Sequence, residues 1–422
     1  MTHTSPGARP VSTLLGATLA DGSVVDVRVG REGEHAVVTA VDPAGSIGSA
    51  PTADDVVDLS GYLLITAPAE PHAHLDKAMS WDTLQPPLGD LHDAIAAWKR
   101  GSAQFDEESF RCRARAAALA LVRNGTTAVR THVDILAGDD PLRGIRAVAA
   151  VRRELRELID IEIVALIKTY SSADLLHAAL DAGADLVGGS PHSAPDPHAE
   201  LTRLLGVAEA RGVGTDLHTD EFLDGDHHTV GAYADRAGQW PPDRNRTASH
   251  CTRLGTMTRS ELDVLVPRIA GAGMGVVANP ITNLYLQGRD QPAATPRGIT
   301  AIEPLRAAGV RVAAGADNVR DPFNPLGRSD ALETAMLAVI AGHLHPDVAL
   351  AMVTEEARAV LGLPAAGPWV GGCAELLAVR GTSVVDVIAN APADRVVIHR
   401  GAVVSRSETQ TWTADPRLSG TR

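Results

Sequence analysis

The most constraining feature of this sequence is a regular alternation of short apolar runs with long Ala-, Leu- and Arg-rich segments between about residues 67 and 365. The short runs are rich in β-branched residues, as strands are, and the longer segments have helical periodicity. This βα alternation predicts a parallel sheet covered by helices. Eight strand candidates occur in the order LLITA, TAVRTHVD, IEIVALIKTY, ADLVGGS, VGTDLHT, RTASHC, GVVANP and RVAAGAD. We therefore predict an α/β fold of the (β/α)8, or TIM-barrel, type.

The alternative for the same pattern is an open, doubly wound sheet. The chain has no Gly-x-Gly-x-x-Gly sequence after its first strand candidate. That absence weakens a dinucleotide-binding interpretation, and the barrel is the preferred prediction.

The two ends of the chain have a different texture. Residues 11–66 contain short strand-like runs such as VVDVRVG, HAVVTAV and YLLITA, and CAELLAVRG, DRVVIHRG and AVVS repeat this texture near the C-terminus. We predict that residues 1–66 and 368–422 pair into one small, split β-sandwich domain. The barrel domain would then occupy residues 67–367.

Charge and cysteine content exclude several classes of function. The 422 residues include 38 basic and 52 acidic residues, for a formal charge of −14, and no basic run offers a footprint for nucleic acid or an anionic membrane. Three unpaired cysteines, Cys112, Cys251 and Cys373, indicate neither a disulfide framework nor a thiolate zinc site. No stretch is apolar enough for a signal peptide or a membrane span. We expect a cytoplasmic protein without nucleic-acid or membrane partners.

Metal-type ligands gather at the carboxyl ends of the predicted strands, where (β/α)8 barrels build their active sites. The first strand runs into His72 and His74, and the period of two places both imidazoles on one side, within reach of one metal ion. His218, His250 and Asp317 follow the fifth, sixth and eighth strands. Each residue alone is equally compatible with a structural role, but their recurrence at one end of successive strands predicts a common site.

Three imidazoles and one carboxylate, from His72, His74, His218 and Asp317, suit one divalent ion, Zn²⁺ or Fe²⁺, with room for water. A metal ion lowers the pKa of its water, and the resulting hydroxide can attack an electrophilic carbon. Glu221, three residues after His218, is placed to carry a proton from this water to a ring nitrogen or a departing amine. A solvated loop carboxylate is the alternative for Glu221.

The order His-x-His, His-x-x-Glu, His and Asp over a predicted barrel resembles the amidohydrolase superfamily. Within that superfamily the chain resembles the cytosine deaminase branch, and the similarity extends across nearly the whole barrel. The matching stretches are residues 70–76 (EPHAHLD), 130–134 (RTHVD), 248–250 (ASH), 278–280 (ANP), 286–289 (LQGR), 297–300 (RGIT) and 321–327 (DPFNPLG).

The resemblance implies a metal-dependent hydrolase of C–N bonds with a split β-sandwich. It implies metal ligation by His72, His74, His218 and Asp317, proton shuttling by Glu221, hydroxide orientation by His250, and acceptance of the water proton by Asp317. The chain also resembles amidohydrolases that act in triazine breakdown, in the stretches 74–77 (HLDK) and 317–318 (DN). The chain departs from the deaminase pattern where Lys168 replaces a glutamine that reads the pyrimidine edge, and where Asn318 replaces a second aspartate.

Lys168 is expected to contact the substrate, because an ammonium only donates hydrogen bonds and favours a carbonyl oxygen or an anion. A solvated side chain is the alternative, and a carbamylated lysine bridging two metals is less favoured because the superfamily takes that lysine from the fourth strand. With Asn318 in place of the second aspartate, one negative charge beside the expected metal ion is absent. Asn283 and Gln287 are further predicted substrate contacts.

The preferred hypothesis is deamination of a small amino-substituted heterocycle, cytosine-like or triazine-like, by the metal-bound hydroxide. One alternative is hydrolysis of a cyclic or linear amide by the same chemistry, with Lys168 binding a carboxylate. A remote alternative is a noncatalytic scaffold on the amidohydrolase fold, although such scaffolds lose ligands that this chain keeps. The sequence leaves the leaving group open, ammonia or an alkylamine, and is compatible with a homo-oligomer.

Overall fold

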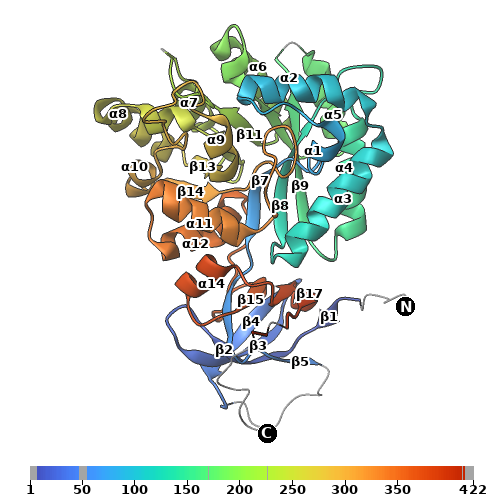
Figure 1. Cartoon of the computed structure of the whole chain (residues 1–422), viewed down its shortest axis with the longest axis vertical. Coiled ribbons are helices and arrows are strands. Elements are labelled where there is room, and N and C mark those ends of the chain that lie inside the picture. The colour runs from blue at the N-terminus through green and yellow to red at the C-terminus, as the bar shows by residue number, and fades with distance from the viewer. Residues whose placement is uncertain (1–6, 47–54, 170, 226, 411, 414–422) are drawn as a thin grey trace.

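The computed structural model describes residues 7–46, 55–169, 171–225, 227–410 and 412–413. Its centre is a sheet of eight parallel strands in the unbroken sequential order β7 to β14 (Figure 1). The sheet closes where Ala73 bridges Asp317 and the backbone N–H of Asp317 donates to the carbonyl of His72 at 2.9 Å. The strands are β7 (Ala69–Ala73), β8 (Ala128–Asp134), β9 (Asp160–Ile167), β10 (Leu186–Gly189), β11 (Thr215–Thr219), β12 (Arg246–His250), β13 (Gly275–Ala278) and β14 (Arg311–Ala314).

Helices surround this barrel, and most of them bury an apolar face. In α4, for example, Ile145, Val148 and Val151 are buried while Arg153 on the other face is exposed. The helices are α1 (Trp81–Leu84), α2 (Leu91–Gly101), α3 (Glu107–Arg123), α4 (Arg143–Leu155), α5 (Ala173–Asp181), α6 (Pro197–Arg211), α7 (Val230–Ala237), α8 (Arg259–Gly271), α9 (Pro280–Leu286), α10 (Ile302–Ala307), α11 (Ala331–Gly342), α12 (Pro346–Val353), α13 (Glu355–Val360) and α14 (Val384–Asn390).

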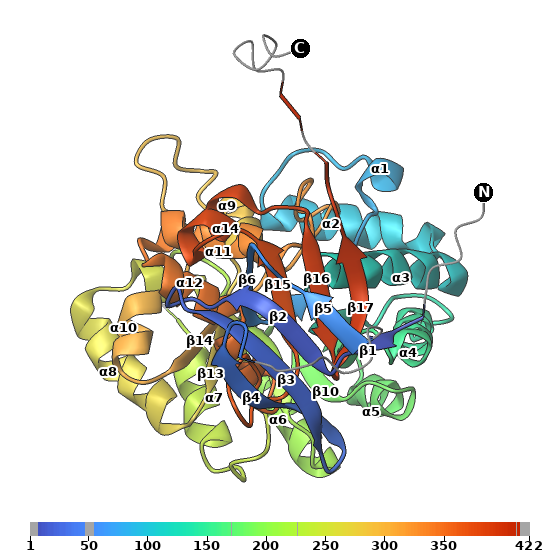
Figure 2. The ribbon, with the colours of Figure 1, turned by 90° about the horizontal axis from the view of Figure 1, so that it is seen from below.

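Both ends of the chain contribute to a second, nine-stranded mixed sheet (Figure 2). An N-terminal and a C-terminal strand lie side by side twice, in the antiparallel pairs β1 with β17 and β6 with β15. Its strands are β1 (Arg9–Pro10), β2 (Thr13–Thr18), β3 (Val24–Glu32), β4 (His35–Pro43), β5 (Val56–Asp58), β6 (Tyr62–Thr66), β15 (Leu376–Arg380), β16 (Arg395–His399) and β17 (Ala402–Ser407). The predicted fold class, a (β/α)8 barrel with a small β domain from both chain ends, is confirmed.

One strand assignment from the sequence is wrong. The run LLITA, expected as the first barrel strand, is β6 of the second sheet, and the first barrel strand is β7. Alternate residues of β6 enter different cores, since Leu63 and Ile65 pack with the barrel while Tyr62 and Leu64 pack within the small sheet. Burial on both faces produces the same continuous apolar run as a barrel strand does, so periodicity could not separate the two.

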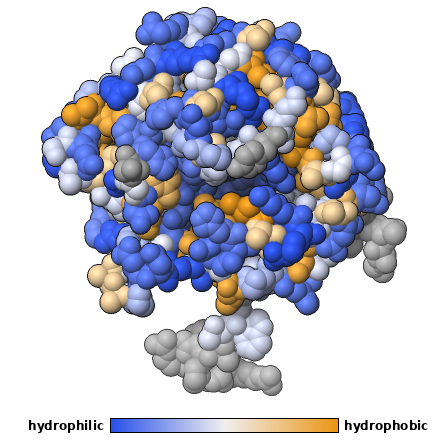
Figure 3. Space-filling model, turned by 90° about the horizontal axis from the view of Figure 1, so that it is seen from above, coloured by the Kyte–Doolittle hydropathy of each residue, from blue (hydrophilic) through white to orange (hydrophobic). Residues whose placement is uncertain are grey.

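The second sheet lies below the amino ends of the barrel strands, as Figure 1 shows. Arg400, which follows β16, forms an ion pair with Asp160 at the start of β9, and Arg395 donates to the carbonyl of Asn124 before β8. The carboxyl ends of the barrel strands therefore face away from the small sheet. Seen from above in Figure 3, this face is mostly hydrophilic and is hollowed near its centre. Among the described helices, none has both the length and the apolar character needed to cross a bilayer.

Candidate active site

The histidines and the aspartate that the sequence singled out converge at the carboxyl ends of the barrel strands. His72 lies near the end of β7, His74 directly after it, His218 in β11, and Asp317 after β14. The Nε2 atoms of His72 and His74 lie 3.6 and 3.3 Å from Oδ1 of Asp317. The Nε2 atom of His218 lies 3.3 Å from Nε2 of His74. Residues that are up to 245 positions apart in the sequence thus form one cluster.

The donor set of this cluster fits a divalent metal ion. Both carboxylate oxygens of Asp317, both ring nitrogens of His72 and Nδ1 of His218 are buried without a hydrogen-bond partner among the described residues. Buried polar atoms are normally satisfied, and these belong to two imidazoles and a carboxylate that converge as ligands of an ion do. Two triads with all ligand atoms within 4.8 Å of one another, His72–His74–Asp317 and His72–His218–His250, have metal-site spacing.

The protonation state of the imidazoles also suits metal binding. Burial, together with neighbouring imidazoles, lowers the pKa of His72 and of His218 well below the usual value. Burial and the nearby Lys77 ammonium do the same for the pKa of His74. The three rings are therefore neutral at pH 7, and a neutral imidazole has the free lone pair that a metal ligand needs.

Glu221, His250 and Asn283 form the second part of the site. Glu221 Oε1 lies 3.2 Å from Nδ1 of His250, and the Asn283 amide lies 3.1 Å from the same nitrogen and 3.4 Å from Oε1 of Glu221. His250 Nε2 faces Asp317 at 3.9 Å. Burial, with the nearby Asp317 carboxylate, raises the pKa of Glu221 well above its usual range, and burial lowers the pKa of His250 to about 4. A carboxyl group with a raised pKa is able to hold and release a proton near neutral pH.

Three residues at or shortly after the carboxyl ends of their strands occupy the left-handed backbone region. The φ angles are +63° for Asp317, +68° for His250 and +46° for Asp220, which precedes Glu221. Residues other than glycine adopt this region at a cost of about 1–3 kcal/mol each, and such residues cluster at functional sites. Both Asp220 carboxylate oxygens accept from the Thr229 backbone N–H, at 2.8 and 3.0 Å, and fix the loop that carries Glu221.

A buried charged cluster lies on the outer side of His74. The Nδ1 atom of His74 lies 3.0 Å from the carbonyl of His132 and 2.9 Å from Nζ of Lys77. Lys77 also donates to Asp134 at 2.9 Å, and Trp98 Nε1 donates to the other oxygen of that carboxylate at 2.8 Å. These contacts hold the His74 ring with Nε2 turned towards Asp317.

The predicted substrate contacts differ in their surroundings. Asn283 lies between Glu221 and His250, as described above, whereas the Asn318 side chain donates to Asp321 at 2.8 Å and braces the loop after β14. Gln287 is half-buried, and its amide nitrogen has no hydrogen-bond partner among the described residues. Lys168 is half-buried after β9, on the site's end of the barrel.

Lys168 also lies near the buried charged cluster. Burial alone would raise the pKa of Asp134, but Lys77 and Lys168 together hold that pKa below its usual value. The substrate roles of Lys168, Asn318, Asn283 and Gln287 stay predictions.

Two buried polar residues of the barrel interior, His132 and Asp216, were not predicted as part of the site. The ring of His132 lies 4.1 Å, centroid to centroid, from that of His72, and its Nε2 atom lies 3.5 Å from Oδ1 of Asp216. The sequence did contain a signal, because Arg130, His132 and Asp134 alternate along β8 and so point to one side of a buried strand.

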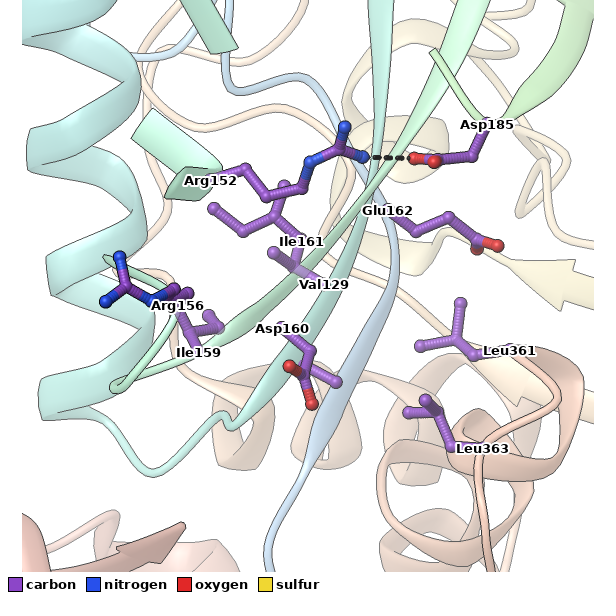
Figure 4. Close-up of a pocket in the computed structure, with 11 residues that line it drawn as sticks. Val129, Arg152, Arg156, Ile159, Asp160, Ile161, Glu162, Asp185, Leu361 and Leu363 are labelled. Atoms are coloured by element: carbon purple, nitrogen blue, oxygen red, sulfur yellow. Dashed lines mark hydrogen bonds and ion pairs between the residues drawn. The ribbon is translucent and has the colours of Figure 1, made fainter. Parts of the chain in front are cut away.

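A cavity of about 290 Å³ lies at the other end of the barrel (Figure 4). Its wall includes Ala128 and Asp160, the first residues of β8 and β9, and the paired side chains of Arg152 and Asp185. None of the predicted metal ligands lines this cavity, so it is separate from the candidate active site.

Comparison with known proteins identifies the family. Residues 103–404 match the family described as "Amidohydrolase family", and the chain belongs to it. A pterin deaminase from Rhizobium rhizogenes is 33% identical over 372 residues, which cover 85% of this chain and 84% of the relative. An N-isopropylammelide isopropyl amidohydrolase from Pseudomonas sp. is 26% identical over 386 residues, with 85% and 89% covered.

The solved structures include a close match in fold. The 5-methylcytosine deaminase from Klebsiella pneumoniae, liganded with 5-fluorocytosine, superposes with a TM-score of 0.85 at 25% identity, covering 95% of this chain and 99% of that one. The predicted membership of the amidohydrolase superfamily, in its deaminase-like branch, is confirmed.

Proposed function

We propose that this chain is a metal-dependent deaminase that hydrolyses a C–N bond of a small amino-substituted heterocycle. The observation that carries the proposal is the convergence of His72, His74, His218 and Asp317 beside a buried carboxyl group, Glu221. The ring nitrogens of His72 and the carboxylate oxygens of Asp317 have no hydrogen-bond partner among the described residues. The proposed ligands are these three histidines and the aspartate. A Zn²⁺ or Fe²⁺ ion held there would acidify water and polarise the substrate.

Glu221 would move the proton that deamination requires. An amine leaves readily only when it is protonated, and the attacking water must lose a proton in the same reaction. Glu221 is positioned for both transfers, since its carboxyl group is buried and borders the cluster through His250 at 3.2 Å. The raised pKa of this carboxyl allows it to accept a proton and then release it to the amine nitrogen.

His250 and Asn283 would hold the reacting groups in place. The ring of His250 lies between Glu221 and Asp317, at 3.2 and 3.9 Å, so it borders both the proton carrier and the ligand cluster. Asn283 contacts both Glu221 and His250 and would hold the two side chains in their relative orientation. A neutral His250 would donate a hydrogen bond to an oxygen that gains negative charge as the ring is attacked.

The substrate class follows from the relatives and from the charges near the site. Pterin, 5-methylcytosine and N-isopropylammelide, the compounds in the relatives' names, all contain an amino-substituted carbon of a nitrogen heterocycle. Lys168 replaces the glutamine of the cytosine deaminase pattern and would donate to a ring carbonyl oxygen. A heterocycle in which one ring nitrogen separates a carbonyl carbon from the amino-bearing carbon therefore suits the site.

The test is a screen for amine release. Protein loaded with Zn²⁺ or Fe²⁺ is incubated with pterin, cytosine, isocytosine and ammelide, and ammonia and alkylamines are measured together. We expect release from at least one ring, its loss on chelation, and its return when the metal is restored. A loaded protein that releases no amine from any ring, but hydrolyses a cyclic amide, would contradict deamination.

A further inference from the structure

A layer of buried polar residues lies beside the proposed metal ligands, inside the barrel. His132 and Arg130 project from β8, and Asp216 projects from β11, all three without solvent exposure. The His132 ring lies 4.1 Å from the ring of His72 at a tilt of 33°, and 4.7 Å from the ring of His218 at 90°. His132 therefore packs against the rings of two proposed ligands.

The same residue touches a third proposed ligand through its backbone. The carbonyl oxygen of His132 lies 3.0 Å from Nδ1 of His74, the nitrogen turned away from Asp317. The carbonyl favours a proton on Nδ1 and the Lys77 ammonium, 2.9 Å from the same nitrogen, favours a lone pair there, so these contacts fix the orientation of the His74 ring rather than its tautomer. One residue of β8 thus contacts His72, His74 and His218.

Asp216 holds the His132 ring in place. Its Oδ1 atom lies 3.5 Å from Nε2 of His132 and accepts from the Ser249 hydroxyl at 2.6 Å, while Oδ2 accepts from Arg130 at 3.0 Å. Arg130 in turn donates through Nε to Glu162, whose carboxylate borders the cavity drawn in Figure 4. Asp216 and Arg130 thus form hydrogen bonds within this chain of contacts, and the His132 ring has the Asp216 carboxylate as its polar neighbour.

His72, His132 and Asp216 also have metal-type spacing, within 4.8 Å of one another. A second ion in this layer is disfavoured, because the Arg130 guanidinium already supplies the positive charge that the buried Asp216 carboxylate needs. The layer is therefore suited to support the proposed ligands rather than to bind an ion itself.

We propose that His132 is a positioning residue of the metal centre, which fixes the orientation of the ligand rings and is itself held by Asp216. The inference rests on the proposed metal-dependent function. Partners behind metal ligands typically contribute 10–100-fold to metal affinity. We expect His132→Phe, which keeps a ring of similar shape but removes its nitrogens, to release the metal roughly 10-fold faster or more.

The experiment follows Co²⁺ bound to the full chain by its visible absorption during a chase with excess EDTA. The matched control is His399→Phe, because His399 is also buried beside a carboxylate, with Nδ1 2.8 Å from Glu375, but lies in β16 of the small sheet. We expect His132→Phe to accelerate Co²⁺ release and to change the absorption band. We expect His399→Phe to lower the melting temperature while release and spectrum match the parent, and His132→Gln, whose amide can donate to Asp216, to recover part of the loss.

Several outcomes would overturn the inference. One is a folded His132→Phe chain with the parent's spectrum and release rate. Another is equal acceleration in His399→Phe, because release would then follow global stability. If His132→Phe does not fold, His132→Gln is the test, and Co²⁺ release from it at the rate of the parent chain overturns the inference. A parent chain that takes up no Co²⁺, Zn²⁺ or Fe²⁺ would instead contradict the proposed function, so the two failures are distinguishable.

Discussion

Replacing Glu221 by Gln separates proton transfer from metal binding. The substitution conserves shape, and the new amide oxygen can still accept from Asn283, which now lies 3.4 Å from Oε1. The burial that raises the pKa of Glu221 favours its neutral form, so a neutral amide should change stability little. Glu221 belongs to neither ligand triad, so metal content should stay that of the parent.

The expected loss of turnover can be estimated from the role assigned to Glu221. A positioned general acid–base group contributes about 10²–10⁴-fold, and the amide can neither accept nor release the proton. At about 1.4 kcal/mol per factor of ten, the barrier should rise by roughly 3–5 kcal/mol. The assay measures amine release under substrate saturation, with metal content determined on the same samples. Turnover within about threefold of the parent, at equal metal content, would refute the proton-carrier role.

Three further changes test other parts of the structure. Lys168→Gln should shift the substrate ranking towards cytosine-like rings, and an unchanged ranking in the amine-release screen would show that Lys168 does not contact the substrate. His218→Ala should weaken metal binding by more than the roughly 10–100-fold that is typical when a residue behind a metal ligand is replaced. Equilibrium dialysis would measure the affinity, and undiminished binding would show that His218 is not a ligand. Burial alone would raise the pKa of Glu375, but the hydrogen bond from His399 and the nearby Arg358 hold it below its usual value. This pairing stabilises the fold above pH of about 4.5 and is lost as the pH falls through the lowered pKa. Glu375→Gln should therefore cost about 3–5 kcal/mol at pH 7 and flatten the decline of unfolding free energy below pH 4.5, and a parental pH profile in denaturant titrations would contradict the pairing.

The barrel could be predicted because parallel strands buried on both faces produce short apolar runs, and because helices between them have a different period. The same rule failed at Tyr62–Thr66, since β6 is buried between two cores and has the composition of a barrel strand. Which sheet a buried strand joins depends on long-range pairing, here with β15 more than 300 residues later. Local sequence does not contain that information.

The cluster of His72, His74, His218 and Asp317 could be predicted because the carboxyl ends of parallel strands meet at one end of the barrel. The neighbouring layer of His132 and Asp216 could not be placed in the same way. His132 and Asp216 lie within strands, where a buried polar residue is equally compatible with a structural hydrogen bond. Their relation to the ligands depends on the register between neighbouring strands, which pairs Thr131 with Ala73 across β7 and β8.

The most direct test of the proposed function measures amine release and metal content together in one titration. Metal-free protein receives increasing Zn²⁺ or Fe²⁺, and release of ammonia or alkylamine from the heterocycle panel is followed at each step. The proposal predicts that activity rises in proportion to bound metal and levels off at one ion per chain. Binding of one ion without amine release from any heterocycle, or amine release from metal-free protein, would contradict it.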